Sequence, residues 1–138
     1  MISCILSPFK TSLWVALIFS WYILTDTRSE YSYSANSFLF SFVNKDNLSP
    51  FKMKIRNNQP YYAIYGSSSY GPTFGDHDIY IGNYANGNTD SYTNLGEAYF
   101  LPRGYSFGST RTRTLLAGSY RFTPSDVEVL YKTGCLQP

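Results

Sequence analysis

Ser37-Phe-Leu-Phe-Ser-Phe-Val43 is the stretch of sequence that decides the fold. Three phenylalanines, Phe38, Phe40 and Phe42, alternate with other residues along it. Successive side chains of a strand point to opposite faces, so the three rings share one face of a predicted strand. We predict that this phenylalanine face packs into the core. The polar residues 44–47 end the strand.

Further extended segments follow, each bounded by turn-forming residues. No segment after residue 30 has the sustained period of 3.6 residues that indicates an amphipathic helix. A single helical turn is predicted at Thr123, because Pro124 would occupy its first position. We therefore predict a mainly β protein, an antiparallel two-sheet sandwich with short helical turns. Its other expected strands are residues 52–56, 61–65, 78–81, 97–101, 115–122 and 127–131.

Length and composition exclude several classes of protein. A chain of 138 residues forms one domain, because a second core would leave both with too little buried area. The content of 43% hydrophobic and 14% charged residues excludes a disordered tail. The formal net charge is +2 and the sequence has no long basic run, so we do not expect nucleic acid as a partner.

Cysteine and histidine are scarce. Cys4 and Cys135 lie at opposite ends of the chain and form no CxxC pair. A single disulfide between them is the alternative that stays open. The one histidine is His77, so a metal site or a Ser-His-Asp relay would have to include it. No second histidine or nearby cysteine accompanies it, and we predict neither a metal site nor a cofactor.

Residues 11–25 are uncharged and strongly apolar. A helix of this length would reach about 22 Å, short of the roughly 30 Å hydrocarbon core, so a full membrane span is disfavoured. A secretory signal or anchor, a buried strand or helix, and a segment foreign to the domain stay open, although no small-x-small cleavage site follows Leu24. The Asn47-Leu48-Ser49 sequon matters only on the secretory route. We assign residues 1–33 to a segment of uncertain origin.

The densest motif ends in Asp76, His77 and Asp78. Carboxylates beside an imidazole suit acid-base chemistry or cation binding. On a strand, however, Asp76 and Asp78 would share one side while His77 points away. We favour a structural role in which the aspartates bind backbone amides of the loop. The residues expected to shape the loop are Gly71, Pro72 and Gly75.

Tyrosines and arginines form two further patterns. The fourteen tyrosines allow a carbohydrate-binding interpretation, but tyrosine is also an ordinary strand residue with a polar tip, suited to positions near the surface. Alternating arginines are typical of a solvated strand edge, although a basic patch is the other interpretation. The basic residues concerned are Arg103, Arg111, Arg113, Arg121 and Lys132.

The chain resembles the TLDc domain family, the module of oxidation-resistance and nuclear-receptor-coactivator-like proteins. Residues 37–42, 71–81 and 117–130 carry the resemblance. It covers residues 34–133, which leaves 134–138 as a tail. Asp76 stands at a position where many animal members have glycine. In this respect the chain is similar to the fungal forms in which a BTB domain precedes TLDc. The family's N-terminal portion, with a Gly-Gly-Phe-like signature, is not found here, so the resemblance implies a partial domain.

The resemblance implies a β-sandwich without established catalytic residues, associated with oxidative-stress protection and with regulation of the vacuolar proton-pumping ATPase. We therefore expect a cytoplasmic, non-catalytic interaction module whose partner is a protein such as an ATPase subunit. Its expected binding residues are Asp76, His77 and Asp78, shaped by the loop described above.

Two alternatives belong to other classes. One is a secreted or membrane-tethered binding domain, in which residues 11–25 act as a signal or anchor. The weakest is an enzyme that uses His77 with Asp76 or Asp78.

Overall fold

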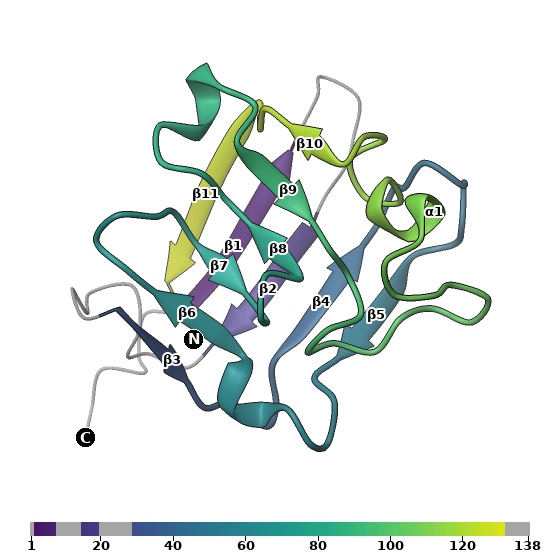
Figure 1. The fold of residues 1–138 in the computed structure, drawn as a ribbon, viewed down its shortest axis with the longest axis horizontal. Helices are drawn as coiled ribbons and strands as arrows, with labels where there is room; N and C mark the ends of the chain where they lie inside the picture. Colours follow the sequence, from purple (N-terminus) through teal and green to yellow (C-terminus); the bar gives the residue numbers. More distant parts are fainter. Residues whose placement is uncertain (1, 8–14, 20–28, 132–138) are drawn as a thin grey trace.

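The computed structural model describes residues 2–7, 15–19 and 29–131, and their strands form two antiparallel sheets. Sheet A contains, in spatial order, β11 (Asp126–Tyr131), β1 (Ile2–Ser7), β2 (Val15–Phe19), β4 (Phe38–Ser41) and β5 (Phe51–Lys54). Sheet B contains β10 (Arg121–Phe122), β9 (Ser91–Thr93), β8 (Ile79–Tyr80), β7 (Thr73–Phe74), β6 (Ile64–Gly66) and β3 (Glu30–Ser32). Sheet B lies over sheet A as a second layer (Figure 1).

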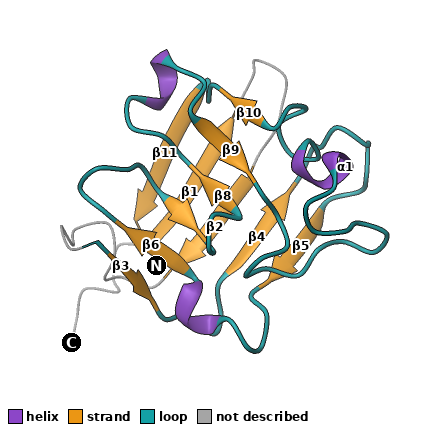
Figure 2. Ribbon diagram, in the orientation of Figure 1, coloured by secondary structure: helices purple, strands orange, loops and turns teal. Residues whose placement is uncertain are grey.

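Helical segments in the described residues are short, as Figure 2 shows. They are two 3-10 turns, η1 (Pro60–Tyr62) and η2 (Ala85–Gly87), and α1 (Thr110–Arg113). The side chain of Ser109 caps α1 by accepting a hydrogen bond from the Thr112 N–H. None of these described helices is long and apolar enough to cross a membrane. The prediction of a mainly β sandwich with little helix is confirmed.

The core lies between the two sheets. Leu39 and Met53 of sheet A and Phe74 and Ile79 of sheet B are buried in one hydrophobic cluster. Tyr99 is buried beside them, and its hydroxyl donates to the Ala63 carbonyl at 2.8 Å. The polar tip of this large ring is therefore satisfied inside the core.

Strand β4 alternates as predicted, but the predicted inner face is wrong. Leu39 and Ser41 are buried, whereas Phe38 and Phe40 are only partly buried and Phe42 is 53% exposed. The Ser41 hydroxyl donates to the Val43 carbonyl at 2.9 Å, so this polar side chain can lie inside. The phenylalanines pack against one another on the outer face, with Phe40 and Phe42 ring centroids 4.9 Å apart.

Several predicted elements differ from those observed. Thr123 and Pro124 begin no helix; β11 starts at Asp126 instead. Within residues 115–122 only β10 is a strand, because the turn that follows α1 occupies the residues before it. Residues 97–101 form no strand beyond a bridge from Tyr99 to Ile55, because the Asp78 carboxylate binds their backbone N–H groups, as described below.

The apolar N-terminal segment contributes to sheet A. Strands β1 and β2 pair with each other, β1 also pairs with β11, and β2 also pairs with β4. Of the interpretations left open for residues 11–25, the structure shows a strand at Val15–Phe19. Cys135 and Lys132, which the sequence singles out, lie outside the described residues.

Candidate functional site

The Gly71–Asp78 motif forms β7 and the turn that leads to β8. Gly75 has a φ of +67°, and a Cβ there would lie 2.1 Å from Asp78 Oδ1, so the turn requires glycine. A Cβ on Gly71 would approach the Ile81 carbonyl to 2.8 Å. The Pro72 carbonyl accepts a hydrogen bond from the Ile81 N–H at 3.1 Å. The three residues for which a loop-shaping role is predicted thus lie at close backbone contacts of this turn.

Asp78 is fully buried and organises a distant loop. Its carboxylate accepts four backbone hydrogen bonds, from Gly96 (2.8 Å), Glu97 (3.1 Å), Ala98 (2.8 Å) and Tyr99 (3.2 Å). Burial raises the pKa of Asp78 to about 6, while the four N–H donors act in the opposite direction. The side chain thus binds backbone amides, as the structural interpretation predicts, although those amides belong to residues 96–99 and not to its own loop.

Asp76 and His77 lie on the outside of the same turn. His77 Nδ1 is 3.3 Å from Asp76 Oδ1, and the Tyr31 hydroxyl donates to that same carboxylate oxygen. The expectation that Asp76 and Asp78 share a side while His77 points away is wrong. The reason is the left-handed backbone of His77, with a φ of +71°, which replaces the alternation of a strand.

A row of tyrosines crosses the outer face of sheet B. The strand register aligns one residue from each strand, because every neighbouring pair is a direct partner. These residues are Tyr31, Tyr65, Thr73, Tyr80, Tyr92 and Arg121. With flanking residues the rings form a continuous series, each centroid 4.9 to 6.3 Å from the next. We call this series the tyrosine row: Tyr62, Tyr31, Tyr65, Tyr70, Tyr80, Tyr92 and Tyr120.

Two arginines lie against the β9–β10 end of the row. The Arg113 guanidinium is 5.1 Å from the Tyr120 ring centroid, and that of Arg121 is 5.5 Å from the Tyr92 centroid. Arg113 donates to Asn94 Oδ1 at 3.1 Å and Arg121 to the Asp90 carbonyl at 3.3 Å. Both acceptors are neutral, and neither arginine forms an ion pair with another described residue.

A shallow pocket of about 330 Å³ opens in the row. The His77 ring stands parallel to the Tyr92 ring, with an interplanar angle of 9° and centroids 6.3 Å apart. The structure therefore brings one of the predicted binding residues together with the row. The pocket is lined by Tyr70, His77, Tyr80, Asp90, Tyr92 and Arg121.

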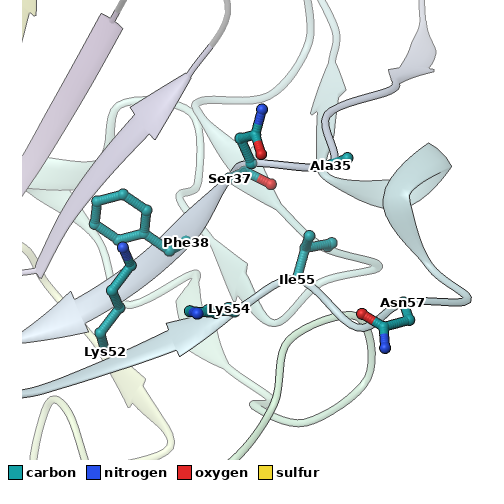
Figure 3. Close-up of a pocket in the computed structure, with 8 residues that line it drawn as sticks. Ala35, Ser37, Phe38, Lys52, Lys54, Ile55 and Asn57 are labelled. Atoms are coloured by element: carbon teal, nitrogen blue, oxygen red, sulfur yellow. The ribbon is translucent and has the colours of Figure 1, made fainter.

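A second hollow, of about 430 Å³, lies on sheet A (Figure 3). Lys52 extends over the Phe38 ring, with its Nζ 3.6 Å from the centroid, and Lys54 lies beside it on β5. Ser37 and Asn57 supply further polar groups at its edge. This hollow combines an apolar ring with two lysines that form no ion pair with the described residues.

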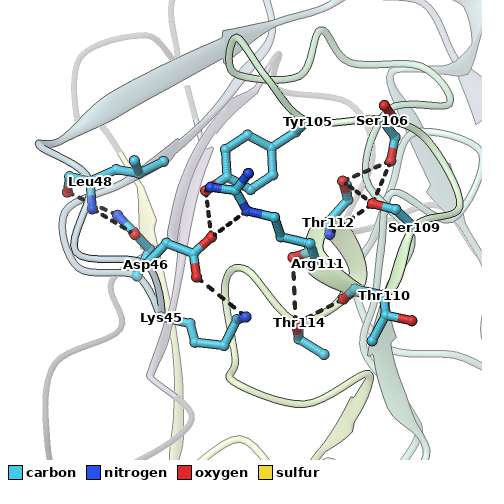
Figure 4. A network of polar contacts seen from close by, with 11 residues as sticks. Lys45, Asp46, Leu48, Tyr105, Ser106, Ser109, Thr110, Arg111, Thr112 and Thr114 are labelled. Carbon is cyan, nitrogen blue, oxygen red and sulfur yellow. Dashed lines mark hydrogen bonds and ion pairs between the residues drawn. The ribbon is translucent and has the colours of Figure 1, made fainter.

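Asp46 joins the β4–β5 connection to α1 and the loop before it (Figure 4). Its Oδ2 accepts from the Tyr105 hydroxyl at 2.6 Å and from Arg111 Nε at 3.1 Å. These hydrogen bonds lower the pKa of Asp46 to about 2, with that of Tyr105 the larger cause. Arg111 is therefore paired. Arg111 and Arg113 both lie on α1, so the predicted strand edge with alternating arginines is wrong.

No group of three or more metal-ligating side chains converges anywhere in the part of the chain that the structure describes. His77 has Asp76 beside it, and Asp78 is turned inward to the backbone of residues 96–99. In the sequence the tyrosines and arginines form two separate patterns, and the row was not predicted from them. The signal that could have indicated it is a tyrosine at the outward position of β3, β6, β8 and β9, which becomes informative only once the strand register is known.

A family model of the TLDc domain matches residues 17–131. The chain belongs to the TLDc domain family. The match confirms the resemblance, and it begins inside β2, whereas the TLDc-like region predicted from the sequence starts at residue 34. No curated protein and no solved structure matches the chain.

Proposed function

We propose that this TLDc domain is a non-catalytic interaction module that binds a protein partner through the outer face of sheet B. The tyrosine row with its two stacked arginines carries this proposal. Tyrosine and arginine are enriched in protein interfaces and dominate their binding energy, because each offers a large contact area together with hydrogen-bonding capacity. The row gathers both residue types on one face.

The same geometry supports a role without catalysis. General acid-base catalysis needs a titratable side chain that can reach the substrate. The Asp78 carboxylate is fully buried and already accepts four backbone hydrogen bonds. Asp76 and His77 stay at the surface, where they border the row and are available for contact with a partner.

Membership of the family motivates the biological part of the proposal: a role in oxidative-stress protection, with a subunit of the vacuolar proton-pumping ATPase as the partner. The test is a pulldown of purified ATPase subunits with the full chain. We expect enrichment over a control β-sandwich protein, and much less with Tyr80→Ser/Tyr92→Ser. Tyr84→Asn is the matched control, because Tyr84 is 82% exposed and lies off the row. No enrichment by the unmodified chain would overturn this partner.

The proposal places the chain in the cytoplasm, and Asn47 offers a direct test. Asn47 is exposed and begins the Asn47-Leu48-Ser49 sequon, so an oligosaccharide would be attached there on the secretory route. We expect no change in gel mobility when the chain expressed in eukaryotic cells is treated with an endoglycosidase. A shift that disappears in Asn47→Gln would instead support the secreted or membrane-tethered alternative.

A further inference from the structure

We propose that the tyrosine row binds an extended segment of its partner that carries a carboxylate side chain opposite Arg113 and Arg121 and an apolar side chain in the pocket beside Tyr80 and Tyr92. This inference rests on the proposed function, and it specifies which surface acts and which chemistry the partner brings.

The charge pattern at the β9–β10 end indicates an acidic group. Arg113 and Arg121 are held over tyrosine rings, and their hydrogen bonds go to neutral oxygens. An arginine fork binds a carboxylate through two parallel hydrogen bonds, and the stacked rings limit the rotamer freedom that binding would otherwise cost. Two oriented guanidinium groups that form no ion pair with a described carboxylate therefore complement an acidic side chain of the partner.

The centre of the row favours a side chain without negative charge. Asp76 lies beside His77, and the charge of Asp76 helps to raise the pKa of Glu97, although burial of Glu97 is the larger cause. These two carboxylates would repel an acidic side chain of the partner. Three of the six residues that line the pocket are Tyr70, Tyr80 and Tyr92, whose rings suit an aromatic side chain or a proline, as in other aromatic-lined peptide grooves.

The dimensions fit a short extended segment. The row crosses sheet B from β3 to β10. Five strand spacings of about 4.8 Å give roughly 24 Å, the length of about seven residues in an extended chain. A segment laid across the strands would thus place its acidic residue at the β10 end and its apolar residue over β8 and β9.

The experiment selects peptides from a displayed library of random ten-residue sequences against the full chain. We expect the enriched peptides to share an Asp or Glu close to an aromatic residue or proline. Synthetic versions should bind Arg113→Ser/Arg121→Ser at least about tenfold more weakly, a change equivalent to about 1.4 kcal/mol. Arg103→Ser is the charge-matched control, because Arg103 is exposed and forms no hydrogen bond or ion pair with a described residue.

A second variant separates the two halves of the proposed surface. Tyr80→Ser/Tyr92→Ser should also weaken binding, whereas Tyr84→Asn should not, and circular dichroism should show that each variant keeps its β structure. Enrichment of peptides without acidic residues would overturn the proposal, as would no enrichment or equal binding by the arginine variant. Tyrosine-dependent binding of a neutral oligosaccharide in place of any peptide would do the same.

The outcomes distinguish this inference from the proposed function. If ATPase subunits bind the unmodified chain and both surface variants equally, the partner stands and this surface is wrong. If acidic peptides bind through the row but no ATPase subunit is retained, the surface stands and the partner is wrong.

Discussion

The outer faces of sheets A and B are both aromatic, but they are built from different residues. Sheet A presents Phe38, Phe40 and Phe42 with Lys52 and Lys54 beside them. Sheet B presents tyrosines, with Arg113 and Arg121 stacked on their rings. Both faces carry cations that form no ion pair with the described residues, so charge alone does not distinguish them.

The two outer faces differ in how their side chains behave when a partner displaces water. A lysine is strongly hydrated and covers an apolar ring with its stem while its ammonium stays in water, as Lys52 does over Phe38. An arginine is more weakly hydrated and keeps a rigid set of donors, and a tyrosine keeps its hydroxyl. The face of sheet B can therefore exchange water for a partner at lower cost, which is why we place the interaction there.

The largest effect is expected from removing the buried carboxylate behind sheet B. Asp78→Ala should lower the free energy of unfolding by about 4 kcal/mol, because four N–H groups, three of them buried, lose their acceptor. Urea denaturation of the purified chain measures this. Asp76→Ala is the matched control and should cost about 1 kcal/mol or less, since Asp76 is only partly buried. Equal losses for the two variants would contradict the assigned roles.

The second test concerns which side of β4 faces inward. Leu39→Ala should cost about 3 kcal/mol, because Leu39 is 0% exposed and its loss leaves a cavity. Phe42→Ala should cost under about 1 kcal/mol, since its ring lies on the outer face. Thermal and urea unfolding of both variants would show the order. A larger loss for Phe42→Ala would restore the orientation predicted from the sequence.

The third test asks whether the rings of the row act together. Tyr80 and Tyr92 are register partners with centroids 5.0 Å apart. A double-mutant cycle with Tyr80→Leu and Tyr92→Leu should give a coupling of about 1 kcal/mol in the free energy of unfolding. The same cycle with Tyr80 and Tyr84 should give none. If the coupling of Tyr80 with Tyr92 were zero, the row would be a set of independent side chains.

The smallest effect is expected from pH, at the Asp46 network on the sheet A side. The pKa of Asp46 is about 2 in the folded chain and near 3.8 in the unfolded one. Its contribution to stability is therefore complete above pH 4 and is lost as the pH falls from 4 towards 2. Unfolding curves collected across this range should show a shallower dependence for Asp46→Asn than for the unmodified chain. An identical dependence would mean that the Tyr105 and Arg111 hydrogen bonds do not perturb Asp46.

The sequence predicts the class of fold because period-two alternation is local information. It does not predict which face of β4 is buried. Residues 38, 40 and 42 are more apolar than residues 39 and 41, yet the latter face inward. When both faces of a strand carry large apolar residues, the choice depends on what packs against each of them. The residues that pack against β4 come from other strands, so the sequence of β4 alone does not determine its buried face.

The candidate site likewise has one part that local sequence predicts and one part that it does not. The chemistry of aspartate predicts that its carboxylate binds backbone amides, and Asp78 does so. The amides themselves lie 18 to 21 residues further along the chain and meet Asp78 only in the folded domain. The tyrosine row depends on the register of five strand pairs at once. No single stretch of sequence contains that alignment, which explains why local reasoning found the loop and missed the row.

The way in which the row is assembled gives it one more property. Strands β3, β6, β8 and β9 each supply one tyrosine to it in register, so moving any of these strands along its neighbour by a single residue would send that strand's ring to the opposite side. An insertion or deletion within one of these strands would therefore divide the surface into two fragments even if the sandwich still folded. The binding face thus tolerates exchanges of side chain far better than changes in strand length.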